Sequence, residues 1–181
     1  MSSLNPIGSP FIELPTVDST NNYAMGLVRA AMAQHGTAVF THEQTKGKGQ
    51  RNKNWLSSKN QNIAISVIVK PGKLSSSELF VLSMMTAVGV HEFLCRYAGD
   101  EVKIKWPNDI YWRDRKAAGI LIENIWQAGH WEFAVIGIGM NVNQSDFGKL
   151  GKKAVSLKQI TGKDFEPVAL AKQLCDMLEE K

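Results

Sequence analysis

The sequence predicts an α+β fold in which a mixed, largely antiparallel β-sheet is flanked by helices. β-Rich segments dominate the middle of the chain, and apolar residues recur at helical spacing towards both ends. Short turns join neighbouring strands in the second half, which indicates hairpins. With 181 residues, of which 44% are apolar, the chain fits one domain with a sufficient core.

The N-terminal third alternates strand, helix, strand and loop. Residues 11–17 predict a short strand, and residues 18–20 supply capping groups for the helix that follows. That helix is expected to end at Gly36, and the β-rich residues 37–43 predict a second strand. Residues 44–60 are polar, contain glycines and lack periodicity, so they predict a long loop of the kind that is often functional.

The central third contains a buried strand and the longest helix. Residues 62–70 are apolar on both faces and predict the strand. Ser75 with Glu78 forms the capping-box pattern of a helix that runs to about Tyr97. The apolar run at 79–90 is shorter than the roughly 20 residues that a spanning helix needs, so no membrane segment is expected.

The last third is expected to hold two strand pairs and a final helix. Residues 102–106 predict a strand that a turn returns into residues 110–112. Residues 119–126 and 131–138 predict a second pair joined by a glycine turn. Pro167 opens an amphipathic helix that reaches the last residues.

Composition excludes several classes of protein. The net charge of +4 is a mild excess, smaller than nucleic-acid-binding proteins usually carry. Cys95 and Cys175 each lie in an apolar helical segment, which favours two buried free thiols over a disulfide or a metal site. Residues 1–10 lack a basic region followed by an apolar run, so no secretory signal is visible. We expect a soluble cytoplasmic protein.

The loop is the first candidate site. Gly47 and Gly49 let the backbone approach a ligand and expose N–H groups to an anion. The loop also carries three cationic side chains that suit phosphate, Lys48, Arg51 and Lys53. Trp55 adds an aromatic ring that can stack on a base. A solvated basic loop explains the same charges equally well. The loop lacks the Gly-Lys-Ser/Thr of a P-loop and the third glycine of a dinucleotide fingerprint.

Three later segments are further candidates, each weak alone. Lys105 ends a predicted strand and Asn108 follows in a turn, so both can face a polar ligand. Lys116 precedes an apolar strand and can reach the same crevice, although lysines also guard strand starts without binding anything. Asn141, after a strand with two glycines, can contact a base edge or a phosphate-bound Mg²⁺, or simply form a turn. Trp106 is expected in the core.

Together and in this order, the segments resemble the biotin–protein ligase family, whose members attach biotin to the carrier protein of biotin-dependent carboxylases. The most specific string is Lys-Trp-Pro-Asn-Asp at residues 105–109. The resemblance covers residues 11–181 and implies a catalytic domain of the class II aminoacyl-tRNA synthetase-like, or biotin–lipoate ligase-like, fold. The other matching motifs are Asp18-Ser19-Thr20-Asn21, Gln44, the Gly47-x-Gly49 loop to Trp55, Lys116-x-x-Gly119-Ile120-Leu121 and Gly137-Ile138-Gly139-x-Asn141.

The resemblance implies a reaction in two steps. The biotin carboxylate attacks the α-phosphate of ATP, which gives biotinyl-5′-adenylate and pyrophosphate, and a lysine of a biotin carboxyl carrier protein then attacks the adenylate and releases AMP. Cations and Mg²⁺ must offset the repulsion between a carboxylate and a polyphosphate. ATP and Mg²⁺ are therefore the implied cofactors, and biotin and the carrier protein the partners. Relatives suggest a homodimer through the sheet edge, and neither DNA nor a membrane is an expected partner.

The resemblance also implies roles for individual residues. Lys116 is expected to be the main catalytic cation, with Arg51 as a second. The residues expected around biotin are Ser19, Thr20, Asn21, Gln44, Lys48, Gly49, Gln50, Lys116 and Gly119. Those expected to contact ATP are Lys48, Arg51, Lys53, Trp55, Asn108 and Asn141. The sequence assigns no metal ligand.

The chain departs from the family pattern in its loop and in its extent. The family loop carries arginine at three positions that hold Lys48, Gln50 and Lys53 here, and the missing charge at Gln50 predicts weaker retention of the adenylate unless Arg51 compensates. We expect neither an N-terminal winged helix nor a C-terminal SH3-like barrel, so that residues 1–181 form a single catalytic domain without repressor activity.

Alternatives remain open at this point. A lipoate–protein ligase shares the fold and the transfer of an acyl group to a lysine. An octanoyl transferase would need a nucleophilic cysteine, and neither Cys95 nor Cys175 lies near the motifs. A non-catalytic nucleic-acid-binding module that uses Trp55 as a stacking platform would show an affinity that falls steeply with salt.

Overall fold

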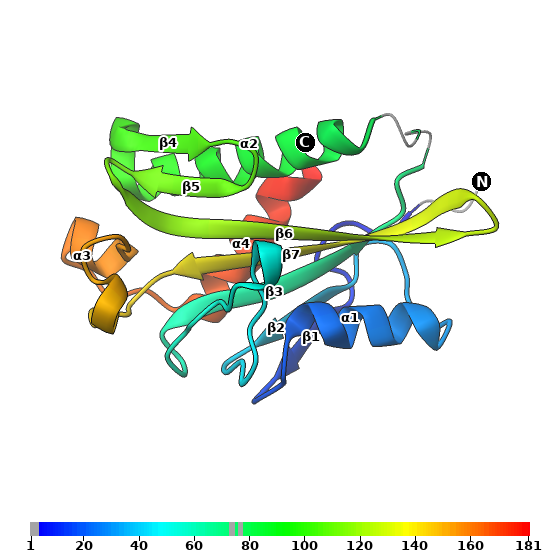
Figure 1. Ribbon diagram of the computed structural model, residues 1–181, viewed down its shortest axis with the longest axis horizontal. Helices are drawn as coiled ribbons and strands as arrows, with labels where there is room; N and C mark the ends of the chain where they lie inside the picture. The colour runs from blue at the N-terminus through cyan, green and yellow to red at the C-terminus, as the bar shows by residue number, and fades with distance from the viewer. Residues whose placement is uncertain (1–3, 73–74, 76–77) are drawn as a thin grey trace.

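The computed structural model describes residues 4–72, 75 and 78–181, and its centre is a twisted β-sheet (Figure 1). The strands are β1 (Phe11–Leu14), β2 (Ala38–Thr41), β3 (Asn62–Val69), β4 (Val102–Lys105), β5 (Asp109–Trp112), β6 (Arg115–Gln127) and β7 (His130–Asn141). The helices are α1 (Thr20–Arg29), α2 (Leu79–Ala98), α3 (Leu157–Thr161) and α4 (Pro167–Glu179). Short 3₁₀ turns lie at η1 (Gln50–Asn52), η3 (Gly99–Glu101) and η4 (Gly148–Leu150).

The sheet is mixed and largely antiparallel, as predicted. Its seven described strands follow the order β1-β2-β3-β7-β6-β5-β4. Within this described part, β1 pairs in parallel with β2, and every other neighbouring pair is antiparallel. Both predicted hairpins form, and Ala128 and Gly129 turn β6 into β7 with φ angles of 49° and 81°, the left-handed values that a tight hairpin needs.

Helices cover the two faces of the sheet unequally (Figure 1). α2 and α4 pack on one face, where Ile63, Ile65 and Val67 of β3 join a large apolar core. α1 packs on the other face over a smaller cluster that includes Ile68. The alternation along β3 is the period of two that any strand imposes on its side chains.

The face beneath α1 carries a patch of very small side chains. In one row across three strands, Ala64 pairs with Gly139, which pairs with Gly119. In the next row, Ser66 pairs with Gly137. Because these residues have almost no side chain, the sheet surface is hollowed here, and other groups can lie directly on its backbone.

The first helix ends earlier than the sequence predicted. α1 stops at Arg29, well before Gly36, because Ala31 adopts a φ of 55° and the Met32 N–H closes on the Leu27 carbonyl at 2.9 Å. Gly36 instead contacts the N-terminal segment. A Cβ there would lie 2.3 Å from the Pro6 carbonyl oxygen, so its lack of a side chain lets the N-terminal segment pack closely.

α2 begins just after the predicted capping residues and ends at Ala98, close to the predicted end at Tyr97. The Glu78 carboxylate accepts hydrogen bonds from the Ser75 N–H and hydroxyl at 2.9 and 2.8 Å. Residues 79–101 are, among those described, the one helical stretch long and apolar enough to cross a membrane by length and composition, which corrects the expectation drawn from residues 79–90. Its buried face, with Phe93 and Leu94, packs in the core beside α4, as the central helix of a globular fold does.

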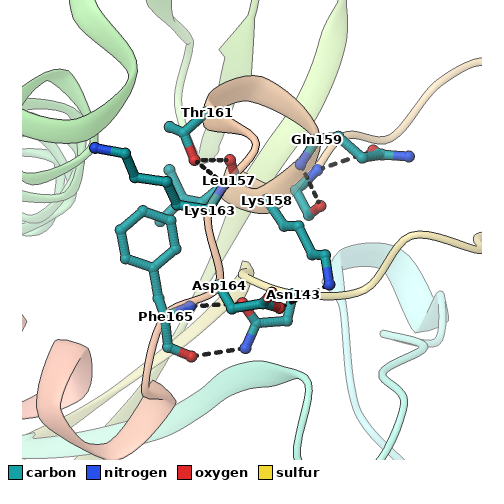
Figure 2. A network of polar contacts seen from close by, with 9 residues as sticks. Asn143, Leu157, Lys158, Gln159, Thr161, Lys163, Asp164 and Phe165 are labelled. Carbon is teal, nitrogen blue, oxygen red and sulfur yellow. Dashed lines mark hydrogen bonds and ion pairs between the residues drawn. The ribbon is translucent and has the colours of Figure 1, made fainter.

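The segment after β7 is tied back by a polar network (Figure 2). The Asn143 amide donates to the Phe165 carbonyl at 2.7 Å and accepts from the Phe165 N–H at 3.0 Å. Lys158 pairs with Asp164 at 2.7 Å, and a capping box opens α3. Asn143 therefore ties the chain just after β7 to the segment that precedes α4.

Candidate functional site

A narrow cavity of ≈ 50 Å³, which we call the inner cavity, opens between the loop, the start of α1 and the hollowed sheet face. All nine residues predicted to surround biotin line it, and they come from the start of α1, from the loop and from the start of β6. The full lining is Ser19, Thr20, Asn21, Gln44, Lys48, Gly49, Gln50, Trp55, Ala64, Ile65, Asn108, Lys116, Gly119, Ile120, Leu121, Gly137, Ile138 and Gly139.

The start of α1 forms one wall of the inner cavity. Ser19 is the N-cap and is 1% exposed, and the Thr20 N–H donates to Gln44 Oε1 at 2.9 Å. Asp18 accepts a hydrogen bond from the Asn22 side chain, and this bond lowers the pKa of the Asp18 carboxyl. The helix start is therefore fixed to the loop, which sets the position of Thr20 and Asn21 relative to Gln44.

A buried polar chain continues from this wall, and it includes two residues that the motifs did not indicate. The Ser66 hydroxyl lies 2.7 Å from Thr20 Oγ1 and 2.6 Å from Asn21 Oδ1. Asn21 Nδ2 donates to Glu123 Oε2 at 2.8 Å, and the Lys48 ammonium lies 3.4 Å from Glu123 Oε1. Only the register of β3 and β6 under α1 could have revealed Ser66 and Glu123, because neither belongs to a motif.

The floor of the cavity depends on glycine. A Cβ on Gly137 would lie 2.1 Å from Asn21 Oδ1, and one on Gly139 would lie 2.4 Å from Cε2 of Trp55. A Cβ on Gly119 would lie 3.0 Å from the end of the Lys116 side chain. β7 runs unbroken through its two glycines to Asn141, so these residues form the floor and do not terminate the strand as we had expected.

Lys116 lies where the loop meets the sheet. It is the second residue of β6, inside the strand and not before it. Its ammonium is 2.6 Å from Asp109 Oδ1 and 5.5 Å from the centre of the Trp55 ring. Backbone hydrogen bonds with Lys153 and Val155 hold the Lys116 peptide from the other side. The carboxylate and the ring thus restrict the ammonium to the boundary of the inner cavity.

A second cavity of ≈ 230 Å³, the outer cavity, lies beyond Trp55. Trp55 and Lys116 line both cavities and so separate them. The outer cavity is lined by Lys53, Asn54, Trp55, Leu56, Tyr111, Lys116, Asn141, Phe147, Leu150, Lys153 and Ala154. The sequence indicated three of its polar members but not Phe147, Leu150 and Lys153, whose approach depends on the tertiary position of the segment after β7.

The residues predicted to contact ATP do not all line the same cavity. Lys53, Trp55 and Asn141 line the outer cavity, whereas Lys48, Trp55 and Asn108 line the inner one. Asn141 is 4% exposed, and its Nδ2 donates to the carbonyls of Lys116 and Val155, so its side chain braces the site. Arg51 is exposed, has a φ of 54°, and lines neither cavity.

Two neighbouring expectations also changed. Trp106, expected in the core, is 50% exposed and lies beside the ring of Phe80, because the turn around Pro107 projects from the sheet edge. Lys105 lies over the Tyr111 ring at 5.1 Å and lines neither cavity. Asn108 is held by its Nδ2, which donates to the Ile120 carbonyl at 3.3 Å.

Neither cysteine approaches the cavities, and no metal centre is built from the described side chains. Cys95 and Cys175 are free, and they lie on α2 and α4, whose core is on the opposite face of the sheet. Burial raises the pKa of the Cys175 thiol to about 12, and burial also raises that of Cys95. Among the described residues, no group of three or more His, Cys, Asp or Glu side chains could hold a metal ion.

Comparison with known proteins decides the family. Residues 13–141 match the sequence model of the Biotin/lipoate A/B protein ligase family, and they include every residue that lines the inner cavity. The chain belongs to this family. The bifunctional ligase/repressor BirA of Escherichia coli is 33% identical over 135 residues, which are 75% of this chain and 41% of that protein. The biotin–[acetyl-CoA-carboxylase] ligase of Paracoccus denitrificans is 31% identical over 163 residues, which are 85% of this chain and 65% of that protein.

Solved structures confirm the predicted fold. The biotin protein ligase of Aquifex aeolicus in complex with biotin and ATP superposes with a TM-score of 0.79 at 29% identity, over 93% of this chain and 68% of that one. The biotin protein ligase of Leishmania major in complex with biotin gives a TM-score of 0.79 at 27% identity, over 94% and 73%. The chain spans less than two thirds of the curated relatives, with 41% of the Escherichia coli protein and 54% of the Bacillus spizizenii one.

Proposed function

We propose that this chain is the catalytic domain of a biotin–protein ligase. It forms biotinyl-5′-adenylate from biotin and ATP, and then transfers biotin to a lysine of a biotin carboxyl carrier protein. The observation that carries the proposal is the position of Lys116 between two cavities. A carboxylate from one side and a nucleotide phosphate from the other can meet only at this ammonium and at Trp55.

The inner cavity suits the ring of biotin. The end beside the start of α1 is lined by Thr20, Asn21 and Gln44, whose hydroxyl and amide groups match the polar groups of a ureido ring. The glycine floor accepts a flat ring and an acyl chain directly on the sheet backbone. With the ring at this end, the carboxylate of the acyl chain points towards Lys116.

The outer cavity suits the nucleotide. Phe147, Leu150 and Trp55 offer apolar and aromatic surface for a base, and Lys53 and Lys153 add positive charge for phosphates. Lys116 offsets the repulsion between the carboxylate and the α-phosphate, while Asp109 holds the ammonium in place. Aligning the two reacting groups accounts for much of the remaining catalysis in reactions of this kind.

The loop has to move during the reaction. The inner cavity is too narrow to admit a bicyclic ring with its chain while Trp55 rests on Gly119 and Gly139. We infer that residues 44–55 lift to admit biotin and close again over the adenylate, which shields the mixed anhydride from water. Lys48 then exchanges its contact with Glu123 for one with the substrate.

The remaining assignments follow from this reaction. Mg²⁺, if bound, would be held by the phosphate oxygens of ATP, the hard ligands that this ion prefers, and would supply positive charge beside them. Arg51 becomes the second catalytic cation when the loop closes. We also propose that residues 1–181 form one domain in a cytoplasmic enzyme, that the enzyme dimerises, and that it binds neither DNA nor a membrane.

Alternatives make different predictions. A lipoate ligase would use the same two cavities, but the named relatives and the solved complexes are biotin enzymes. An octanoyl transferase would pass through a thioester, and Cys175 is buried with a pKa of about 12 on the far side of the sheet. A nucleic-acid-binding module would bind through the exposed loop and would not need the inner cavity.

The deciding experiment is mass-spectrometric detection of an acyl-adenylate after the protein is mixed with Mg²⁺, ATP and either biotin or lipoate. Biotinyl-adenylate alone supports the proposal, and lipoyl-adenylate would move the chain to the sister activity. With neither product, a binding titration against single-stranded RNA at two salt concentrations tests the remaining alternative. Biotinylation of an added carrier domain then tests the second step.

A further inference from the structure

Glu123 fixes which way the Asn21 amide faces. Asn21 Nδ2 lies 2.8 Å from Glu123 Oε2 and 3.4 Å from the Leu121 carbonyl oxygen. A carboxylate and a carbonyl only accept hydrogen bonds, so a reversed amide would place Oδ1 against two other oxygens. The amide nitrogen therefore faces β6, and Oδ1 faces Ser66.

The direction of the whole polar chain then follows from counting hydrogens. The Ser66 hydroxyl has one proton and must donate it to Asn21 Oδ1, because those two oxygens are only 2.6 Å apart. The 2.7 Å contact between Ser66 and Thr20 can then form only if the Thr20 hydroxyl donates to Ser66. Gln44 Oε1, which accepts from the Thr20 N–H at 2.9 Å, is the longer alternative acceptor for the Thr20 hydroxyl at 3.2 Å, and it also lies inside the wall.

Thr20 consequently presents only lone pairs to the inner cavity. Its single hydroxyl proton is used inside the wall, and Thr20 and Asn21 are each 3% exposed while Ser66 is fully buried. Water cannot easily reorganise a chain at this depth. A ligand gains a hydrogen bond from Thr20 Oγ1 if it brings an N–H or O–H donor, and it gains none if it brings an acceptor.

We propose that Glu123 and Ser66 are positioning residues that make Thr20 a hydrogen-bond acceptor and thereby select a ring that carries N–H donors. The inference rests on the proposed function and explains its specificity. The ureido ring of biotin carries N–H groups, whereas the dithiolane ring of lipoate has none and would bring no donor to the lone pairs of Thr20 Oγ1. Sites built for hydrogen-bonding groups reject analogues that lack them much more strongly than apolar pockets reject size differences.

The test compares biotin with an analogue whose ureido nitrogen carries a methyl group in place of its proton. Calorimetry gives the Kd of each ligand, and the ratio of the two Kd values measures how strongly the site demands the N–H. Ser66→Ala removes the group that holds the Thr20 proton inside the wall, so Thr20 is no longer fixed as an acceptor. Biotin should then bind more weakly while the methylated analogue changes little, and we expect the ratio to fall by roughly two- to tenfold, on the order of one hydrogen bond. In the adenylation assay, the KM for biotin should rise while kcat changes little.

Two substitutions of Glu123 separate its hydrogen bond from its charge. Glu123→Gln and Glu123→Leu both remove the ion pair with Lys48, but only glutamine still offers an acceptor to Asn21. The glutamine variant should keep the Kd ratio, and the leucine variant should lower it. Since Glu123 is partly exposed, this pair carries the test even if the buried Ser66 variant fails to fold.

Thr86→Val is the matched control, because it removes another buried hydroxyl that binds the Leu82 carbonyl inside α2, away from the cavity. It should leave the ratio unchanged. Equal losses for both ligands in Ser66→Ala, or equal ratios in the two Glu123 variants, would overturn the inference while leaving the ligase assignment intact. A wild-type protein that binds no biotin would refute both, and one that binds lipoate as tightly as biotin would refute the inference.

Discussion

Substitution of Gly139 by alanine tests the geometry that divides the two cavities. Gly139 lies on the floor beneath Trp55, and an added Cβ would meet Cε2 of the indole at 2.4 Å and Nε1 at 2.7 Å. Carbon atoms prefer separations of about 3.5–4.0 Å, so the ring must rise by roughly 1 Å or more. The indole is rigid, and relief has to come from the backbone of the loop.

The expected cost is moderate for stability and large for activity. Overpacking typically costs about 1–3 kcal/mol, and in a protein of this size each kcal/mol lowers Tm by roughly 2–4 °C. The core between the sheet, α2 and α4 lies on the opposite face and should be unaffected. Displacing Trp55 opens the boundary between the cavities, and misplacing a reacting group by about 1 Å can cost on the order of a hundredfold in rate.

The assay combines thermal unfolding with the rate of pyrophosphate release in the presence of biotin, ATP and Mg²⁺. Gly26→Ala is the matched control, because a Cβ at Gly26 of α1 meets nothing within 4 Å, and alanine should stabilise the helix slightly. If Gly139→Ala forms the adenylate at the wild-type rate with an unchanged Tm, Trp55 does not rest on the sheet as described, and the division into two cavities is wrong.

Three further predictions concern single side chains. Lys116→Ala should abolish adenylate formation and leave the fold intact, because the ammonium lies at the cavity boundary and outside the core. The control is Lys103→Ala, which removes an exposed lysine of β4. Adenylation by the Lys116 variant at the wild-type rate would show that this lysine has no catalytic role. Gln50→Arg should slow release of the adenylate, measured by chasing labelled adenylate with unlabelled ligand, and an unchanged release rate would end that interpretation. Burial lowers the pKa of His35, whose Nδ1 accepts a hydrogen bond from the Lys70 N–H. The unfolded chain therefore binds more protons than the folded one, so the free energy of unfolding, measured with denaturant, should fall as the pH drops below about 6.5. His35→Asn should weaken that pH dependence.

The sequence predicted which residues line the inner cavity better than it predicted the boundaries of the elements. Motif residues such as Gln44 and Lys116 were selected for their side-chain chemistry, which is visible in the sequence, and the roles assigned to them stay predictions. Ser66 and Glu123 escaped notice because a serine in an apolar strand and a glutamate in a β-rich segment acquire meaning only when the register aligns them beneath α1. The end of α1 was misjudged because a left-handed alanine, Ala31, closed the helix where a glycine was expected to do so.

The charges of the candidate site indicate that, under the proposed function, the loop supplies part of the positive charge for the adenylate. Lys116 is paired with Asp109 and Lys48 with Glu123, so both cations that line the inner cavity have a carboxylate partner. The Lys48 pair is partly exposed at 3.4 Å, and such a pair contributes roughly 0–1 kcal/mol, so a phosphate can replace Glu123 at little cost. Gln50, which also lines the inner cavity, is neutral. If the proposed reaction is right, additional positive charge for the adenylate has to come from Arg51, which is exposed, and from Lys53 in the outer cavity, and closure of the loop would bring it to the reacting groups. In this chain, closure of the loop is thus expected to govern how long the adenylate is retained.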